Sequence, residues 1–247
     1  MQANEWFRLW FSSPYYDILY HERNKEEAER LIDKLMNFLQ MPEHSFILDA
    51  ACGKGRHSIA LAAKGFDVTG VDICASAITE AKKYETNNLH FYLHDIRLPF
   101  YINYFNYAFN FFTSFGYFKT LREHNDAMRT IAQSLKLNGM LILDYLNVHF
   151  AEDNLKHTET AEINHVVFDI KRWVDEKHFY KRIDVKDEEK KVNESFTERV
   201  EKFYLSDFTN MFSQQGLQIE TVFGDYDLNE YDEKKSQRMI MVAKKIR

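Results

Sequence analysis

Proline, glycine and cysteine are scarce in this chain, whose 247 residues include three prolines, eight glycines and two cysteines. With so little proline and glycine, no stretch has the composition of a flexible linker. Two cysteines do not make a disulfide framework, and a chain without one suits a reducing compartment. We therefore expect a cytoplasmic protein, and its length is sufficient for one α/β domain with a full core plus an insertion.

Long apolar runs and an excess of positive charge are also lacking. No stretch is long and apolar enough to span a bilayer, and the first residues, MQANEWFRLWF, lack the apolar core of a signal peptide. The chain has 32 Lys and Arg against 38 Asp and Glu, a net charge of −6, whereas broad binding to phosphate backbones needs a basic surface. We expect no nucleic-acid partner, no membrane partner, and a monomer or homodimer.

The most informative segment is ILDAACGKGRHSIALAAKGFDVTGVD, which runs from Ile47 to Asp72. It reads as a strand, a glycine-rich turn, a helix and a second strand that ends at Asp72. Gly53 and Gly55 let the turn approach a ligand closely, and the helix after it begins with free N–H groups. A carboxylate about 17 residues after the second glycine is well placed for a ribose diol. The pattern predicts a site for a nucleoside cofactor.

A dinucleotide is the first candidate for that cofactor. The dinucleotide fingerprint needs a small third residue where the helix packs on its strand, and Ser58 occupies that place. Asp49 also puts a carboxylate where a pyrophosphate would lie, and like charges repel, whereas a ligand with an amine or sulfonium suits it. An NAD(P)-dependent oxidoreductase therefore stays open only as the alternative.

The glycine turn and Asp72 resemble the nucleotide-binding half of class I S-adenosylmethionine-dependent methyltransferases, of the type that acts on small molecules. The resemblance covers roughly Ser45 to Asn147 and implies S-adenosylmethionine as the cofactor. We expect no metal. The resemblance also implies that Asp49 and the glycines hold the methionine portion, that Asp72 takes the ribose hydroxyls, and that Asp95 faces the adenine amine. The cofactor-binding residues that we expect are Asp49, Ala51, Gly53, Gly55, Arg56, Asp72, Ile73, Asp95, Ile96, Phe111 and Tyr16.

Strands and helices alternate from Ser45 to Leu146, which predicts a parallel sheet with right-handed crossovers. The resemblance makes the fold a Rossmann-like, doubly wound seven-stranded sheet whose last strand, Arg238 to Lys244, is antiparallel. After strand five, three segments alternate apolar and polar residues, which predicts a small antiparallel β insertion at about residues 160–204. These segments are 163–173, 178–185 and 192–203. We place the methyltransferase domain at residues 45–247.

Residues 1–44 have a different character. Seven aromatic residues lie between Trp6 and Tyr20, and an amphipathic helix is expected from about Lys25 to Leu39. A segment buried against the sheet would explain the aromatic residues. A lid over the cofactor would also explain them, because aromatic faces attract a sulfonium by cation–π interaction. We expect an N-terminal aromatic lid segment followed by a helix, and the two explanations are compatible.

The residues just after strands four and five are the candidates for the methyl acceptor, because ligands bind beyond the carboxyl ends of parallel strands. We select Tyr117, Asn147 and His149 as catalytic candidates, although each also has a structural explanation. Enzymes that methylate amino groups of nucleic acids resemble one another in an Asn or Asp that is followed, after strand four, by two prolines and an aromatic residue. Residues 110–113 of this chain read Asn-Phe-Phe-Thr and lack these prolines. The expected function is methyl transfer by in-line displacement to a small-molecule N or O acceptor. A non-catalytic, S-adenosylmethionine-binding regulatory module remains a further alternative.

Overall fold

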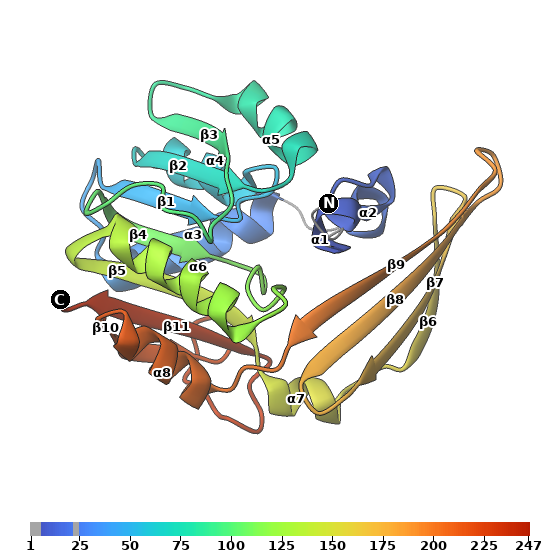
Figure 1. The fold of residues 1–247 in the computed structure, drawn as a ribbon. Helices are drawn as coiled ribbons and strands as arrows, with labels where there is room; N and C mark the ends of the chain where they lie inside the picture. The colour runs from blue at the N-terminus through green and yellow to red at the C-terminus, as the bar shows by residue number, and fades with distance from the viewer. Residues whose placement is uncertain (1–5, 22–24) are drawn as a thin grey trace.

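The computed structural model describes residues 6–21 and 25–247, so residues 1–5 and 22–24 of the expected lid segment lie outside the described part. Two sheets make up the architecture: a seven-stranded sheet with helices on both faces, and a four-stranded sheet that projects beside it (Figure 1). Within the described residues, no helix is long and apolar enough to cross a membrane.

The large sheet has the strand order β10-β11-β5-β4-β1-β2-β3. The five strands from β5 to β3 are parallel, and β11 runs antiparallel to both β5 and β10. The expected Rossmann-like sheet with an antiparallel last strand is confirmed. The strands are β1 (Phe46–Ala50), β2 (Asp67–Asp72), β3 (Leu89–Leu93), β4 (Phe105–Asn110), β5 (Leu135–Leu146), β10 (Leu217–Phe223) and β11 (Arg238–Lys245).

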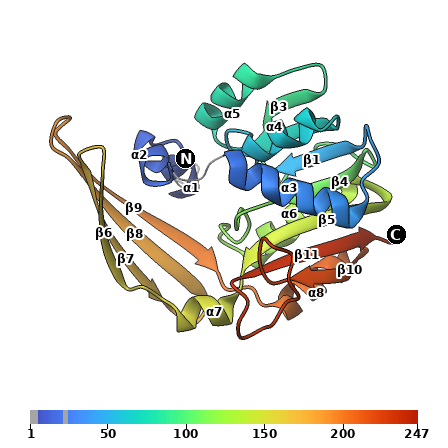
Figure 2. The same ribbon diagram turned by 180° about the vertical axis from the view of Figure 1, so that it is seen from behind.

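Helices cover both faces of this sheet, and the turned view of Figure 2 brings α3 and α4 to the front. Successive strand residues point to opposite faces, so Ile47 lies in the core beneath α3 and α4, and Leu48 lies in the core beneath α6 and α8. Helix α6 begins at a capping box, in which Thr120 and Glu123 each accept a bond from the other's main chain. The helices are α3 (Lys25–Leu39), α4 (Arg56–Ala63), α5 (Ala75–Ala81), α6 (Leu121–Ser134) and α8 (Leu205–Gln214), with a 3-10 turn at Lys82–Tyr84.

The insertion follows β5 and a short helix, α7 (Val148–Asp153), as expected, but it has four strands where the sequence predicted three. The missed strand is β6, whose residues are exposed or half-buried throughout, so it lacks the apolar alternation that marks a half-buried strand. Asn164 and His165 have φ values of 51° and 63° and make the turn between β6 and β7. The strands are β6 (Thr158–Ile163), β7 (Val166–Val174), β8 (His178–Asp187) and β9 (Val192–Glu201).

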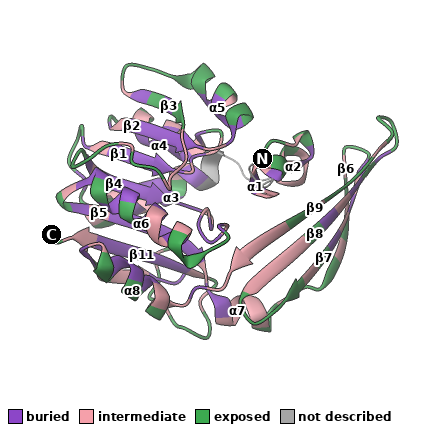
Figure 3. Ribbon diagram, viewed as in Figure 1, coloured by how far each residue is buried: buried purple, intermediate pink, exposed green. Residues whose placement is uncertain are grey.

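The aromatic segment forms two short helices, α1 (Trp6–Phe11) and α2 (Pro14–Leu19), which lie between the two sheets (Figures 1 and 2). Trp10 is fully buried in a third core with residues of β7 and β8, and its indole Nε1 donates to Glu198 at 2.7 Å. Figure 3 shows the strands of the large sheet mostly buried, whereas much of the insertion is half-buried or exposed. The segment therefore covers the apolar face of a sheet that has no helix layer of its own.

Candidate active site

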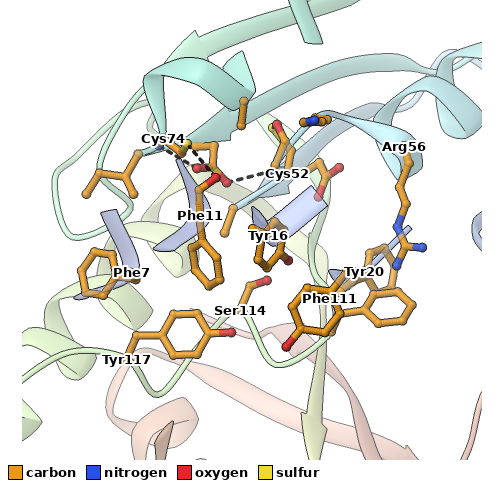
Figure 4. Close-up of a pocket in the computed structure, with 18 of the residues that line it drawn as sticks. Phe7, Phe11, Tyr16, Tyr20, Cys52, Arg56, Cys74, Phe111, Ser114 and Tyr117 are labelled. Carbon is orange, nitrogen blue, oxygen red and sulfur yellow. Dashed lines mark hydrogen bonds between the residues drawn. The ribbon is translucent and has the colours of Figure 1, made fainter. Parts of the chain in front are cut away.

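A cavity of about 480 Å³ opens where the carboxyl ends of β1, β2 and β4 face the α1–α2 segment (Figure 4). Ligands of open α/β sheets bind at this edge, because the loops that leave neighbouring parallel strands meet there. Ten of the eleven expected cofactor-binding residues line the cavity, and of the three catalytic candidates only Tyr117 does.

Asp49 is the last residue but one of β1 and is 2% exposed. Its Oδ2 accepts a hydrogen bond from the Ser58 hydroxyl at 2.5 Å. Burial raises the pKa of Asp49 to about 6, and the negative charge of Asp72 adds to this effect. A buried carboxylate of this kind is stabilised by a cationic group beside it. The end of β1 therefore fits an ammonium or sulfonium ligand.

The turn after β1 is built from left-handed residues, with φ of 63° at Ala51, 57° at Gly53 and 81° at Gly55. A Cβ on Gly53 would meet no protein atom within 4 Å, because this position faces the cavity. A Cβ on Gly55 would lie 2.5 Å from the ring of Phe91. The two glycines therefore have different structural roles. Gly53 leaves room for a ligand, whereas Gly55 does not line the cavity and lets the turn pack on β3.

Asp72 is the last residue of β2, and its side chain bonds to the loop after β1 and to the loop after β2. Its Oδ2 accepts from the Gly53 N–H and its Oδ1 from the Cys74 N–H, both at 2.8 Å. Burial raises the pKa of Asp72, although these main-chain donors oppose the rise. Each carboxylate oxygen has a second lone pair, so this fixed carboxylate can still accept two ligand hydroxyls. The arrangement fits a ribose diol.

The next loop supplies Asp95 and Ile96 to the cavity, beside Ile73. Arg97 donates two hydrogen bonds to the Asp95 carboxylate, from Nε to Oδ1 at 3.0 Å and from Nη2 to Oδ2 at 2.6 Å. Burial raises the pKa of Asp95, but the Arg97 hydrogen bonds outweigh it and leave that pKa below its usual value. The two isoleucines offer an apolar surface suited to a flat base, with an oriented carboxylate at its edge.

The loop after β4 is held in an unusual conformation. Phe112 and Thr113 have consecutive left-handed φ values of 58° and 57°. Buried Asp144 of β5 fixes them: its Oδ2 accepts from the Phe112 N–H at 2.7 Å, and its Oδ1 accepts from Arg238 Nε at 2.8 Å. Strained backbone of this kind gathers at functional sites. Sequence reasoning missed this support, although a lone aspartate in the apolar strand LILDYL was a signal for it.

His57 lies in the first turn of α4, at the wall of the cavity. Its ring packs against Phe111 and Phe112, with centroids 4.7 Å and 5.2 Å apart. Burial lowers the pKa of His57 well below its usual value, so the ring is neutral. Its Nε2 is buried and has no hydrogen-bond partner in the described part of the chain. A polar ligand in the cavity would relieve such an orphaned atom.

Side chains of α1 and α2 cover the cavity on the side away from the strands. Tyr16 and Phe11 line it with their rings 5.1 Å apart, and the Phe11 ring lies 5.7 Å from that of Tyr117. Asp17 pairs with Lys54 of the glycine turn at 2.7 Å. The aromatic segment is therefore joined directly to the loop that Gly53 belongs to.

The structure does not bring Asn147 and His149 to the cavity. Asn147 is 1% exposed, and its amide donates to the carbonyls of Glu233 and Ser236, both at 2.8 Å. His149 lies on α7, with its Nε2 3.4 Å from a Glu233 oxygen and its side chain 41% exposed. The reason is topological: β5 lies between β4 and β11, and its end turns toward the loop that precedes β11.

The cavity also contains residues that the sequence did not single out as site residues, notably Tyr20 of the turn after α2 and Glu198 of β9. The aromatic run SPYYDILY was a signal for Tyr20. Glu198 sits in a strand with several charged neighbours and has no distinguishing sequence signal. Its position at the cavity follows only from the packing of the insertion.

The sequence is similar to those of known methyltransferases. Residues 20–222 match the family model described as a methyltransferase domain. The chain is 32% identical over 107 residues to YqeM of Bacillus subtilis, a methyltransferase by its name. It is 30% identical over 134 residues to the dTDP-3-amino-3,4,6-trideoxy-alpha-D-glucopyranose N,N-dimethyltransferase of Streptomyces venezuelae.

These alignments cover 42% and 52% of this chain, and 43% and 54% of the two relatives, so the chain spans about half the length of the curated relatives it matches. Among solved structures, an S-adenosylmethionine-dependent methyltransferase from Clostridium acetobutylicum ATCC 824 has the same fold, with a TM-score of 0.77 and 17% identity. That similarity covers 93% of this chain and 96% of the other.

Proposed function

The chain belongs to the class I S-adenosylmethionine-dependent methyltransferases, and from this premise we propose that it methylates an N or O atom of a small molecule. The observation that carries the proposal is that three residues face one cavity at the same edge of the sheet. They are the buried Asp49, Gly53 with free space beside its Cα, and Asp72, which accepts two main-chain hydrogen bonds. A nucleoside that carries an amino acid requires three features: a carboxylate for its cationic group, room beside the main chain, and a fixed acceptor for its ribose hydroxyls.

Named residues would hold the cofactor. Asp49 and the Gly53 turn would hold its methionine portion, Asp72 its ribose, and Ile73 with Ile96 its base. When bound, S-adenosylmethionine supplies a methyl group on a sulfonium, which the lone pair of an acceptor attacks in line. The protein's part is to align the acceptor and exclude water. Tyr16 and the other rings of the aromatic segment serve this purpose as a lid.

A small acceptor fits the enclosure of the cavity by α1, α2 and β9. The Streptomyces venezuelae relative is named for methylation of an amino sugar, which supports the same class of acceptor here. Incubation with methyl-labelled S-adenosylmethionine and small amines and alcohols tests the proposal. We expect label in a small molecule. Cofactor binding without transfer to any acceptor would instead favour the regulatory module, and label confined to protein or nucleic acid would contradict a small acceptor.

The affinity for S-adenosylmethionine should rise with pH through about 6. Asp49 has a pKa of about 6 in the free protein, and a cationic ligand favours its ionised form. Since ionised Asp49 increases from roughly a tenth to nine-tenths between about pH 5 and pH 7, we expect about tenfold tighter binding over this range. Calorimetric titrations across it measure the effect. Asp49→Asn should bind weakly and without this slope, and a wild-type affinity that is flat or falls with pH would contradict the assignment.

A further inference from the structure

Glu198 of β9 is a carboxylate that reaches the cavity from the insertion. Its Oε1 accepts from the Trp10 indole at 2.7 Å and from the Tyr20 hydroxyl at 3.0 Å. No residue of the described chain donates a hydrogen bond to its Oε2. Two donors from the aromatic segment thus orient the carboxylate, and one oxygen remains for a ligand.

Hydroxyl groups line the same cavity as this carboxylate. In Figure 4 the hydroxyls of Tyr20, Ser114 and Tyr117 point toward one another across the cavity, beneath the rings of Phe11 and Tyr16. Hydroxyls can accept hydrogen bonds from an N–H group, and aromatic faces attract a cation through their ring quadrupole. The cavity thus combines aromatic walls, the hydroxyls of Ser114 and Tyr117 as acceptors, and the Glu198 carboxylate, whereas the Tyr20 hydroxyl already accepts from Lys181.

The charges around the cavity favour a cation over an anion as its occupant. Among the described residues of the lining, the Lys and Arg side chains are Lys54, which pairs with Asp17 at 2.7 Å, and Arg56, which lies over the Phe112 ring at 4.2 Å. Five carboxylates of the described part of the chain share the same lining. They are Asp17, Asp49, Asp72, Asp95 and Glu198. Asp17 and Asp95 form ion pairs with basic side chains. Among the described residues Asp49, Asp72 and Glu198 form none, although Lys181, opposite Glu198 on β8, donates to the Tyr20 hydroxyl. An anionic group placed directly beside Glu198 would be repelled.

Asp49 and Asp72 are assigned to the cofactor in the proposed function, on which the present inference rests, and this leaves Glu198 for the acceptor. We propose that the acceptor is an amine that enters as its ammonium ion, bound by Glu198 Oε2 and by the surrounding rings. The nitrogen must lose a proton before its lone pair can form the new bond. That proton passes from the ammonium N–H to the Glu198 carboxylate, which becomes a carboxylic acid and then returns the proton to water.

Binding of probes with one shape and different charge tests this inference without turnover. With S-adenosylhomocysteine at saturation, calorimetry compares 2-phenylethylamine, 2-phenylethanol and phenylacetate, and then glucosamine, glucose and glucuronate. We expect the amine of at least one set to bind about tenfold more tightly than its alcohol, as for a hydrogen bond to a charged group, and the carboxylate to bind most weakly. Equal binding, no binding of either amine, or a preference for the alcohol would overturn the proposal.

Two variants locate the effect. Glu198→Gln keeps an oxygen for Trp10 and Tyr20 but removes the charge, so the preference for the amine should disappear. Glu194→Gln makes the same change at an exposed position of β9 and should keep that preference. A preference that survives Glu198→Gln would overturn the role of Glu198. Titration with S-adenosylhomocysteine alone separates the two proposals: if it binds and the amine preference is absent, only the amine acceptor is wrong, whereas a failure to bind overturns both.

Discussion

Replacing Gly53 with leucine is expected to weaken S-adenosylmethionine binding at least about 100-fold, which corresponds to about 2.8 kcal/mol. The side chain at this position would project into the cavity, where no protein atom lies within 4 Å of the added Cβ. It would occupy the space that the proposal gives to the methionine portion of the cofactor. The fold itself has room for the side chain, so the loss should fall on binding.

Gly65 offers a matched control for this experiment. Both glycines have left-handed φ, 57° and 89°, and both have open space where a Cβ would be added. Leucine therefore introduces a similar backbone strain at either position, but Gly65 lies between α4 and β2 and does not line the cavity. Gly65→Leu should keep wild-type affinity in calorimetric titrations. Normal binding by Gly53→Leu, or equal losses in both variants, would show that the turn is not the cofactor site.

Asp72→Ala should weaken S-adenosylmethionine binding by about 10- to 100-fold, because hydrogen bonds to a charged acceptor contribute about 1.5–3 kcal/mol. The change also leaves the N–H groups of Gly53 and Cys74 without their acceptor. Asp72→Asn retains one side-chain oxygen and should show a smaller loss. Dissociation constants and melting temperatures measured on the same samples separate the binding defect from the folding defect.

Asp67→Ala is the control for Asp72, since Asp67 begins the same strand at the opposite edge of the sheet and does not line the cavity. It should bind the cofactor as the wild type does. If Asp72→Ala keeps the wild-type dissociation constant, Asp72 does not hold the ribose and the site must be reassigned.

Features encoded locally in the sequence were predicted well. The strand–helix alternation and the place of the insertion were confirmed, because glycine turns and apolar alternation act over a few neighbouring residues. The seven-stranded sheet with its antiparallel last strand, which the resemblance implied, was confirmed as well. The strand β6 was missed because neither of its faces is deeply buried, so hydrophobic alternation does not mark it. Its partner β7 contributes Phe168 and Ile170 to the third core, and that strand was recognised.

The candidate site divides in the same way. The glycine turn and Asp72 belong to one continuous strand–helix–strand unit, so their proximity could be inferred from spacing. Glu198 reaches the cavity only because the aromatic segment packs between the two sheets. Its hydrogen bond with Trp10 joins residues that are 188 positions apart in the sequence. Asn147 lies away from the cavity because its loop turns toward the loop before β11. The sequence shows that Asn147 follows β5, but not which neighbouring strand its loop turns toward.

Titration of the wild-type protein with S-adenosylmethionine, S-adenosylhomocysteine, NAD and NADP tests the central assignment most directly. Buried Asp49 opposes a pyrophosphate and favours a cationic ligand at the glycine turn. We therefore expect saturable calorimetric binding of S-adenosylmethionine and its demethylated product at one site per chain, and no binding of either dinucleotide. Binding of NAD or NADP together with no response to S-adenosylmethionine would contradict the assignment of this cavity.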